Sequence, residues 1–595
     1  MSKNQLESKP GISQNYMWFM IVTLAIFALG FAMMLGGVSG TNYAEHSPLV
    51  QVITFFLAFM PILLVLIGML GFNLSALKVS PFAFLLAVLL SYTFFANMEH
   101  SPVELAHAIW SQTWSGIVSS FYIMGLILFS FLILDMMQTS GAMDIVKGKL
   151  AAISGGDRRV QLIIIGLFVP IFMEGAAGAG TPAAIAGPFL VGLGFDPVLA
   201  VVVALMADGV CTSFGGSGLT TMSGGAELVT QGVSTQDLNF AAAGWFHLVG
   251  ILVMPFLILF FAYGKKAFKG KGIAGYALYC GVIGAALMLI FSNFIGGFVT
   301  DMGTGLVGII FAILGLKIFK IETPKELYSE PPKMQGTPKY SFVRALSPYI
   351  FILIILPVTL TVSKFINVTN PDGSTIPLWN YVVGKVTYNG WVDLLLFLCS
   401  LLSIITLRFG FGNYWKAFGR AIKKVIPVFI IMASLYSVAN IMKINFITAN
   451  PEAGIESMSM IKLLATDIAA VTGPVYPAGA VLIGAIGAFI TGTNLGANQL
   501  FATMHIHAAD ILGINKIMTF ASSNAGGSLG NMICPNNVTA ACATVGITGE
   551  ESKVMKRVVV MFIICLALYM VLSMLYVYVV FPHVTAASPN MFSAG

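Results

Sequence analysis

Three ionisable side chains inside long apolar stretches are the residues of this chain best suited to carrying protons. Glu174 opens a glycine-rich segment, Asp208 lies within the next apolar stretch, and His505 follows a second glycine-rich segment. A charged side chain at membrane depth costs roughly 2.5–3.5 kcal/mol, so each of these residues invites a functional interpretation. The alternative for each is structural: Glu174 would accept N–H bonds from the segment it opens, Asp208 would brace its helix, and His505 would be a hydrogen-bonded core histidine.

The neutral polar residues near these groups are suited to binding a small carboxylate that carries a hydroxyl group. No Lys or Arg lies between Arg159 and Lys265, and only Lys516 lies between Lys462 and Lys553. An anion there would be met by amides, hydroxyls and the free N–H groups of helix N-termini. The same side chains could instead satisfy the backbone of interrupted helices. The candidate substrate-binding residues are Gly175, Gly178, Gly180, Thr181, Ser213, Gly215, Thr491, Thr493, Asn494, Asn498, Asn524 and Asn531.

These residues gather at glycine-rich interruptions of apolar sequence, above all residues 174–182 (EGAAGAGTP) and 491–499 (TGTNLGANQ). Lipid offers the backbone no hydrogen-bond partner, so irregular chain at membrane depth survives only where it lines a cavity within the protein. Two such interruptions in corresponding halves of a chain are typical of a transporter binding site.

Composition places the chain among helical membrane proteins. Hydrophobic residues make up 57% and charged residues 9% of its 595 positions, whereas a soluble domain carries roughly 25% charge. Apolar runs long enough to span a bilayer recur along the chain, beginning with residues 16–37, which lack a signal-peptide cleavage site. The six cysteines lie in apolar stretches and are expected to be buried thiols. We expect no nucleic-acid partner, no metal and no cofactor.

Basic clusters in the loops predict the membrane topology, because cytoplasmic loops are rich in Lys and Arg. Residues 160–194 must then form a re-entrant hairpin entered from the cytoplasm, and residues 476–511 one entered from outside. The fold predicted is an all-α polytopic membrane protein with about thirteen spans, a cytoplasmic N-terminus and an external C-terminus. The clusters that carry this prediction lie near residues 147–159, 265–271, 317–344, 408–424 and 553–557.

The two halves of the chain resemble an inverted repeat, as in many secondary transporters. Each hairpin follows a short, mildly charged segment and ends in a similar turn, LGFDP at 193–197 and LGINK at 512–516. Asp196 and Asn515 are suited to capping the helices that follow. Those helices are both expected to be broken. The predicted domains are an extra span at 1–45, a first repeat at 46–272 with broken helix 197–230, linking spans at 273–344, and a second repeat at 345–595 with broken helix 516–548.

At these interruptions the chain resembles the lactate permease family. The resemblance rests on residues 174–182 and on residues 190–197 (LVGLGFDP), with shorter matches in order up to residues 540–546 (AACATVG). It implies proton-coupled uptake of L-lactate and related 2-hydroxy monocarboxylates, such as glycolate, across a bacterial inner membrane. The chain departs from the family pattern at four places. The family usually has an aromatic residue where this chain has Ala179, and Asn where it has Asp208. It usually has Ser-Asp-Thr at residues 493–495 and Lys where this chain has Asn531.

The predicted function is therefore secondary active import of a 2-hydroxy monocarboxylate with protons, and not enzymatic activity. An intramembrane transferase would need paired acidic metal ligands or a nucleophile with a base, and neither Asp-x-x-Asp nor His-Glu-x-x-His occurs. A channel agrees less well with inverted hairpins, which favour alternating access. The alternative is a sodium-coupled small carboxylate symporter with Asn494 and Asn524 among its oxygen ligands. The lipid bilayer is an expected partner, and a homodimer is left open as the assembly.

Overall fold

A computed structural model provides the structure, and it divides the chain into two compact units. One unit comprises residues 1–120 and 427–471, and the other comprises residues 121–426 and 472–595. The second unit contains all the candidate residues named above. Each unit is described by itself. The structure describes residues 14–72, 74, 76–153, 156–178, 181–329, 339–365, 367–369, 375–377, 393–450, 456–547 and 550–582.

In the smaller unit, three apolar helices at the start of the chain pack together. They are α1 (Gln14–Leu35), α2 (Pro48–Leu66) and α3 (Ala76–Tyr92). The first part of α4 (Pro102–Ser140) contacts the last part of α16 (Phe411–Ile441), where Ser437 Oγ donates to Thr113 O at 3.2 Å. The other elements of this unit are η1 (Tyr43–Glu45), η2 (Ile67–Gly71), the antiparallel strands β3 (Asn445–Ile447) and β4 (Met458–Ser459), and α17 (Met460–Thr472).

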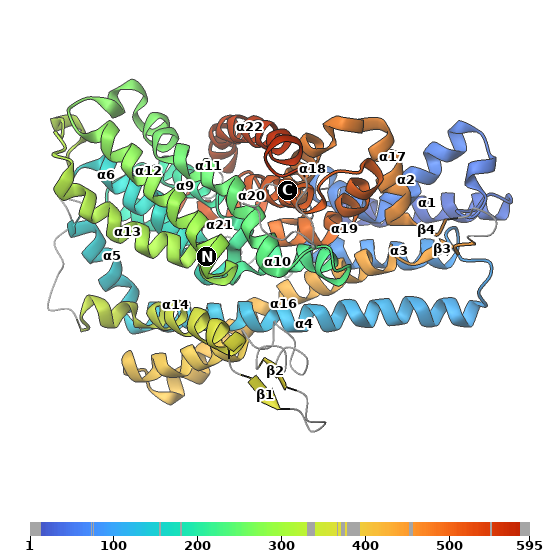
Figure 1. Ribbon diagram of the computed structural model, residues 1–595, viewed down its shortest axis with the longest axis horizontal. Coiled ribbons are helices and arrows are strands. Elements are labelled where there is room, and N and C mark those ends of the chain that lie inside the picture. The colour runs from blue at the N-terminus through green and yellow to red at the C-terminus, as the bar shows by residue number, and fades with distance from the viewer. Residues whose placement is uncertain are drawn as a thin grey trace, which may run out of the picture. The chain divides into compact units, whose positions relative to one another are not determined.

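The larger unit is a helical bundle built around two hairpins and two broken helices (Figure 1). The hairpins are α6 (Arg158–Ile163), η3 (Ile164–Phe168), α7 (Val169–Ala177) and α8 (Thr181–Gly192), and α18 (Tyr476–Thr491) with α19 (Asn494–Leu512). The broken helices are α9 (Pro197–Asp208), η4 (Thr212–Phe214) and α10 (Gly215–Thr230), and α20 (Lys516–Asn531) with α21 (Pro535–Thr544). These elements occupy residues 158–192, 476–512, 197–230 and 516–544, and the re-entrant arrangement expected for the hairpins stays a prediction.

Further helices and one pair of strands complete the larger unit. The strands pair antiparallel, with Val368 opposite Ile376, inside a loop predicted to be external. The elements are α5 (Ala142–Ile153), α11 (Gln236–Tyr263), η5 (Gly264–Phe268), α12 (Ile273–Ile290), η6 (Phe291–Ile295), η7 (Gly297–Val299), α13 (Thr300–Ile318), η8 (Lys325–Leu327), α14 (Phe342–Phe365), β1 (Asn367–Thr369), β2 (Thr375–Pro377), a helix at Asp393–Thr406, η10 (Gly473–Val475), α22 (Glu551–Leu575) and η11 (Tyr576–Val580).

A buried arginine fixes the base of the first hairpin. Arg159 is 0% exposed, and its guanidinium donates to both carboxylate oxygens of Asp157, at 3.1 and 2.7 Å. It also donates to the carbonyl oxygens of Ala267, Lys269 and Glu322, in the segments that follow α11 and α13. A buried guanidinium is tolerated because these oxygens accept its N–H groups. We call this arrangement the Arg159 latch.

Side-chain caps begin both broken helices, which confirms the sequence prediction. Asp196 accepts a hydrogen bond from Leu199 N at 2.9 Å, and Asn515 accepts one from Met518 N at 3.0 Å. Each cap replaces a backbone partner that the first turn of a helix lacks. The first broken helix bends by 63° between α9 and the η4–α10 segment. Residues 216–218 then have φ angles of 55°, 58° and 77°, a left-handed run that glycine adopts at little cost and that fills two of the three positions here.

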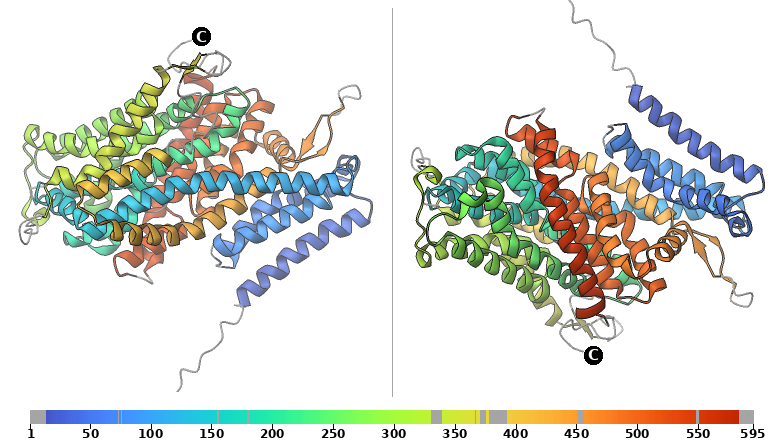
Figure 2. Two further views of the ribbon diagram at one scale, coloured as in Figure 1. Left: turned by 90° about the horizontal axis from the view of Figure 1, so that it is seen from below. Right: turned by 90° about the horizontal axis from the view of Figure 1, so that it is seen from above.

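The order of elements in residues 142–263 occurs again in residues 460–575. In each series a short helix, α5 or α17, precedes a hairpin, a broken helix and a long apolar helix, α11 or α22. The short helices have 12 and 13 residues, too few for the roughly 20 that span a bilayer. In the larger unit α22 packs against α9, α18 and α20 (Figure 2), so elements of both series share one core. The domain boundaries expected from the repeat stay a prediction.

The prediction of an all-α polytopic membrane protein is confirmed. Within the described residues, nine helices are long and apolar enough to cross a membrane, or ten if the bent pair of α9 and α10 forms one span. Three shorter apolar helices lie at Leu77–Tyr92, Phe342–Ile352 and Asp393–Thr406. The thirteen crossings and the sides from which the hairpins enter stay predictions. The six cysteines are buried, as expected.

Candidate functional site

Glu174 lies in the last turn of α7, beside the turn of the first hairpin, and is 1% exposed. Its Oε1 lies against Gly215, where a methyl group would overlap it. Among the described residues, no N–H group donates to its Oε2. The interpretation of Glu174 as an acceptor that braces the glycine-rich turn therefore gains no support from this oxygen.

The carboxyl groups of Glu174 and Asp208 lie within hydrogen-bonding distance of each other. Asp208 is buried at the end of α9, and its Oδ2 accepts from Asn531 Nδ2 at 2.7 Å. Asn531 is itself held by Asn537, which donates to its Oδ1 at 2.8 Å. A hydrogen bond between two carboxyl groups requires a proton on one of them, because ionised carboxylates only accept. The first hairpin and both broken helices thus meet at this pair of buried carboxyl groups.

A third buried carboxyl group, absent from the sequence predictions, lies beside this pair. Asp301, in the first turn of α13, is 1% exposed and interacts electrostatically with both Glu174 and Asp208. Gly175 allows the approach, since a Cβ there would lie 2.5 Å from Met302 N and 2.7 Å from Asp301 Cβ. The sequence signal was the one that singled out Glu174, an acidic residue in a long apolar stretch. We call Glu174, Asp208 and Asp301 the carboxyl cluster.

Three asparagine side chains join the second hairpin to both broken helices. Oδ1 of Asn524 accepts from Asn494 Nδ2 at 3.1 Å and from Asn498 Nδ2 at 2.9 Å. Nδ2 of Asn524 donates to Thr221 Oγ1 at 2.6 Å, and Asn498 also donates to Thr220 O at 3.0 Å. We call Asn494, Asn498 and Asn524 the amide network. Oδ1 of Asn494 and Oδ1 of Asn498 have no partner within the described part of the chain, so both are buried acceptors without a donor there.

Ser213 connects this network to a buried histidine that the sequence predictions also omit. Its hydroxyl donates to Asn524 O at 3.2 Å and lies 2.7 Å from His247 Nε2. The hydroxyl of Tyr569 lies 3.3 Å from His247 Nδ1. With Ser213 donating to a carbonyl, the consistent arrangement is a neutral imidazole that donates from Nε2 and accepts at Nδ1. His247 therefore orients Ser213, and its place in an apolar stretch was the sequence signal.

The threonines of the second glycine-rich segment serve its own backbone. Thr491 Oγ1 donates to Gly487 O at 2.9 Å and to Thr493 O at 2.8 Å. Thr493 Oγ1 accepts from Gly496 N at 3.0 Å and so caps α19. These hydroxyls match the structural alternative, in which polar residues satisfy an interrupted helix.

His505 lies inside the second hairpin. Its Nδ1 is 2.8 Å from Tyr476 OH, and its ring also contacts Phe501. Nε2 has no hydrogen-bond partner among the residues that the structure describes. The contacts found do not join His505 to the carboxyl cluster, so its role in proton coupling stays a prediction.

Close backbone contact explains the glycines of the first turn. Gly178 has a φ of 62°, and a Cβ there would lie 2.8 Å from Gly216 N. The turn thus packs directly against the bend of the first broken helix. Thr181 is the first residue of α8, and Gly180 lies outside the described residues.

A family model for L-lactate permease matches residues 54–580. The chain belongs to the L-lactate permease family. As a member of that family it is a multi-pass membrane transporter and not an enzyme. The match contains the whole carboxyl cluster and amide network, whereas α1, the extra span expected from the sequence, precedes it.

Curated relatives of the L-lactate permease family match most of the chain. The L-lactate permease of Salmonella typhimurium is 25% identical over 533 residues, which cover 83% of this chain and 91% of that protein. Glycolate permease GlcA of Escherichia coli is 27% identical over 484 residues, covering 74% and 82%. Among solved structures, the YdaH transporter of Alcanivorax borkumensis matches with a TM-score of 0.42 and 16% identity, covering 80% of this chain and 88% of that chain.

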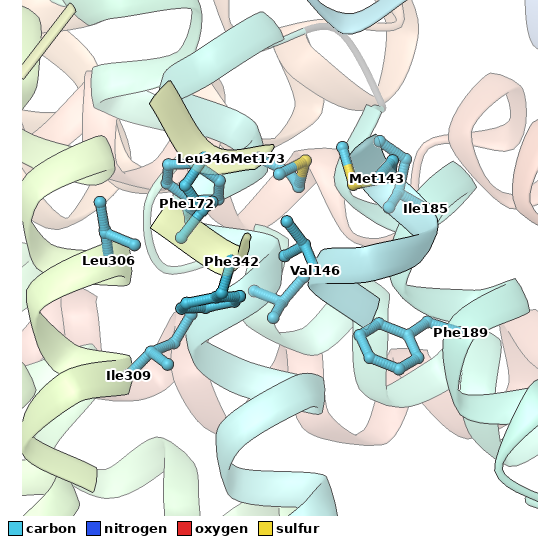
Figure 3. Close-up of a pocket in the computed structure, with 11 residues that line it drawn as sticks. Met143, Val146, Phe172, Met173, Ile185, Phe189, Leu306, Ile309, Phe342 and Leu346 are labelled. Carbon is cyan, nitrogen blue, oxygen red and sulfur yellow. The ribbon is translucent and has the colours of Figure 1, made fainter. Parts of the chain in front are cut away.

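An apolar cavity beside the first hairpin is a poor site for the polar substrate of a lactate permease relative. Phe172 and Met173, which precede Glu174 on α7, face it together with side chains from α5, α8, α13 and α14 (Figure 3). A carboxylate placed there would lose its hydration without gaining a donor. The carboxyl cluster and the amide network instead offer polar groups. The cavity is lined by Met143, Val146, Val169, Phe172, Met173, Ile185, Phe189, Leu306, Ile309, Phe342 and Leu346.

Proposed function

We propose that this chain imports L-lactate or a related 2-hydroxy monocarboxylate, such as glycolate, together with protons across the bacterial plasma membrane. Family membership and relatives named L-lactate permease and glycolate permease support the substrate class. The observation that carries proton coupling is the contact between the buried carboxyl groups of Glu174 and Asp208.

This pair is suited to a coupling proton because removing the proton leaves two like charges side by side away from water. Such an arrangement is strongly unfavourable, since no Lys or Arg forms an ion pair with either group in the described residues. A movement that separates the first hairpin from the first broken helix would expose the two groups and release the proton. The contact therefore links proton release to the position of the hairpin.

The substrate hydroxyl is expected to donate to the amide network. Asn494 Oδ1 and Asn498 Oδ1 are buried acceptors without a partner in the described residues, and a hydroxyl supplies the missing donor. The carboxylate would be met by the N–H groups at the starts of α8, α10 and α19. The remaining sequence candidates, among them Gly178, Ser213 and Gly215, would line the same site and keep its backbone accessible.

A sodium-coupled small carboxylate symporter is the second candidate. Na⁺ prefers oxygen ligands, and the partnerless Oδ1 atoms of Asn494 and Asn498, four residues apart on α19, could supply two. The proton is favoured because a carboxyl pair binds it without further ligands. We also propose a cytoplasmic N-terminus, an external C-terminus and an inner-membrane location, with a homodimer as the assembly to test first.

Transport by purified protein in proteoliposomes tests this function. Uptake of labelled L-lactate is measured with an imposed pH gradient, an imposed Na⁺ gradient, or neither. We expect accumulation only with the pH gradient, acid outside. Accumulation driven by Na⁺ alone would replace the proton with the second candidate, and no uptake of any 2-hydroxy acid would reject the substrate class.

A further inference from the structure

Asp301 is a buried carboxyl group beside the first hairpin. The proton shared by Glu174 and Asp208 leaves it without a role. It belongs to α13, whose first turn approaches the hairpin closely at Gly175. Both of its carboxylate oxygens are buried and lack a hydrogen-bond partner among the described residues. One turn further along α13, the hydroxyl of Thr304 is also buried without a partner. Residues three apart lie on one face of a helix, so two unsatisfied polar groups face the same region.

An ionised Asp301 in this position would be very unfavourable. A buried carboxylate is stabilised by donors or by a cation, and Asp301 has neither within the described part of the chain. The titratable groups that interact with it electrostatically are Glu174, Asp208 and the Cys211 thiol. None of them supplies positive charge. In this conformation Asp301 therefore carries a proton of its own, in addition to the one shared by Glu174 and Asp208.

Two features indicate that this proton is exchanged and not permanent. A carboxylic acid with a purely structural role donates its O–H to a carbonyl or similar acceptor, and Asp301 has no such acceptor among the described residues. Its place in the first turn of α13 helps the proton to leave once water reaches the site, since the half positive charge of a helix N-terminus then adds to hydration in stabilising the anion. Asp301 can therefore hold its proton while it is buried and release the proton when water reaches its carboxyl group.

We propose that Asp301 binds a second coupling proton, so that each transport cycle carries one monocarboxylate with two protons. The substrate contributes one negative charge and the protons two positive charges, so one net positive charge moves inward in each cycle. This inference rests on the proposed proton-coupled function. It differs from that function in a measurable way, because a cycle with one proton would be electrically neutral.

The test measures L-lactate accumulation in proteoliposomes under an imposed membrane potential, inside negative, without a pH gradient. With one net charge per cycle, a potential of about 59 mV should sustain about a tenfold accumulation. Asp301→Asn should abolish this response to potential while accumulation driven by a pH gradient persists. Asp393→Asn is the matched control, because Asp393 is a half-buried acid whose Oδ1 is buried without a partner among the described residues, packed near Gly125 and not part of the carboxyl cluster. It should respond to potential as the unaltered protein does.

The outcomes separate the two proposals. If the unaltered protein accumulates L-lactate with a pH gradient but ignores the potential, the second proton is rejected and the proposed function stands. A response to potential that survives in Asp301→Asn assigns the second proton to another group and also rejects the inference. If a pH gradient has no effect on the unaltered protein, the proposed function itself fails. The measurement on the unaltered protein decides the stoichiometry even if Asp301→Asn does not fold.

Discussion

At the scale of single residues, Glu174 combines deep burial with a carboxyl partner, and its charge state should set the coupling. Glu174→Gln keeps the size of the side chain but cannot exchange a proton. We expect accumulation driven by a pH gradient to fall to the level that the Asp301 proton alone sustains, because the proton shared with Asp208 has lost one of its two holders. Exchange of labelled for unlabelled L-lactate should be at least partly retained. Both rates are measured in proteoliposomes.

The control for this variant is Glu326→Gln, which changes an exposed carboxylate in η8. It should transport as the unaltered protein does. Concentrative uptake that survives unchanged in Glu174→Gln would reject its role as proton carrier and transfer that role to Asp208 or His505.

Proton-coupled uptake should require glycine at position 215, because the Glu174 carboxyl group packs directly against its Cα. In Gly215→Ala the added methyl overlaps Glu174 Oε1, and overpacking of this kind costs about 1–3 kcal/mol. Displacing the carboxyl group from Asp208 should lower uptake driven by a pH gradient about tenfold or more. Gly479→Ala is the control, since a Cβ at Gly479 in α18 meets no atom within 4 Å. Equal uptake by the two variants would show that the contact with Gly215 is unimportant.

Sequence reasoning found the residues that local patterns mark and missed Asp301 and His247, which the fold brings to the site from other helices. Asp196 and Asn515 were recognisable because a cap contacts its own helix. Glu174 and Asp208 stood out as acids in apolar sequence. Asp301 has the same signal and follows the break at Gly296 and Gly297, but only the fold brings it to Gly175. Thr491 and Thr493 were expected at a ligand, yet their hydroxyls serve adjacent backbone.

At the scale of elements, the opposite orientation of the two hairpins is the feature to test. Single cysteines replace Asp196 or Lys516, in the turns after the hairpins, in a protein freed of its six native cysteines. We expect a membrane-impermeant maleimide to label residue 196 only from the cytoplasmic side and residue 516 only from outside. Loss of the Asp196 cap costs about 1 kcal/mol and should not prevent folding. Labelling of both positions from one side would contradict the inverted arrangement.

The amide network should stabilise the contact of α20 with α10 and α19. Asn524→Ala removes the acceptor shared by Asn494 and Asn498 and the donor to Thr221. We expect a loss of about 1–3 kcal/mol in stability, since buried polar groups lose partners. Thermal unfolding in detergent measures this loss. Asn413→Ala, at an exposed position of α16, should change stability by less than about 0.5 kcal/mol. Similar midpoints for the two variants would argue against a stabilising network.

The starts of α9 and α20 could be predicted, because the caps Asp196 and Asn515 mark where these helices begin. The bend of 63° in the first broken helix and the left-handed run at residues 216–218 could not. Their geometry depends on the first hairpin, whose Gly178 lies against Gly216. A glycine-rich segment can adopt many backbone conformations, and tertiary contacts select one of them.

At the scale of the whole molecule, substrate selection should reflect the buried acceptors of the amide network. A substrate without the hydroxyl leaves them unpaired, at a cost of about 1–3 kcal/mol, or roughly ten- to a hundredfold in affinity. L-Lactate and glycolate should therefore compete with labelled L-lactate far better than propionate and acetate. Malate should compete poorly, because the helix N-termini offset about one negative charge. Equal inhibition by propionate and L-lactate would reject hydroxyl recognition, and strong inhibition by malate would indicate a dicarboxylate carrier.

The Arg159 latch determines how the first hairpin can act mechanically. Because Arg159 binds the base of the hairpin to the segments after α11 and α13, we expect the hairpin to bend beyond this base during transport and not to slide. The π-helical segment η3 (Ile164–Phe168) lies between Arg159 and Glu174. Helices commonly bend at such segments. Glu174 is about 10 Å beyond η3 at 1.5 Å per residue, so a bend of about 10° displaces it by about 2 Å. A displacement of this size would break the hydrogen bond between Glu174 and Asp208 while the base of the hairpin stays in place.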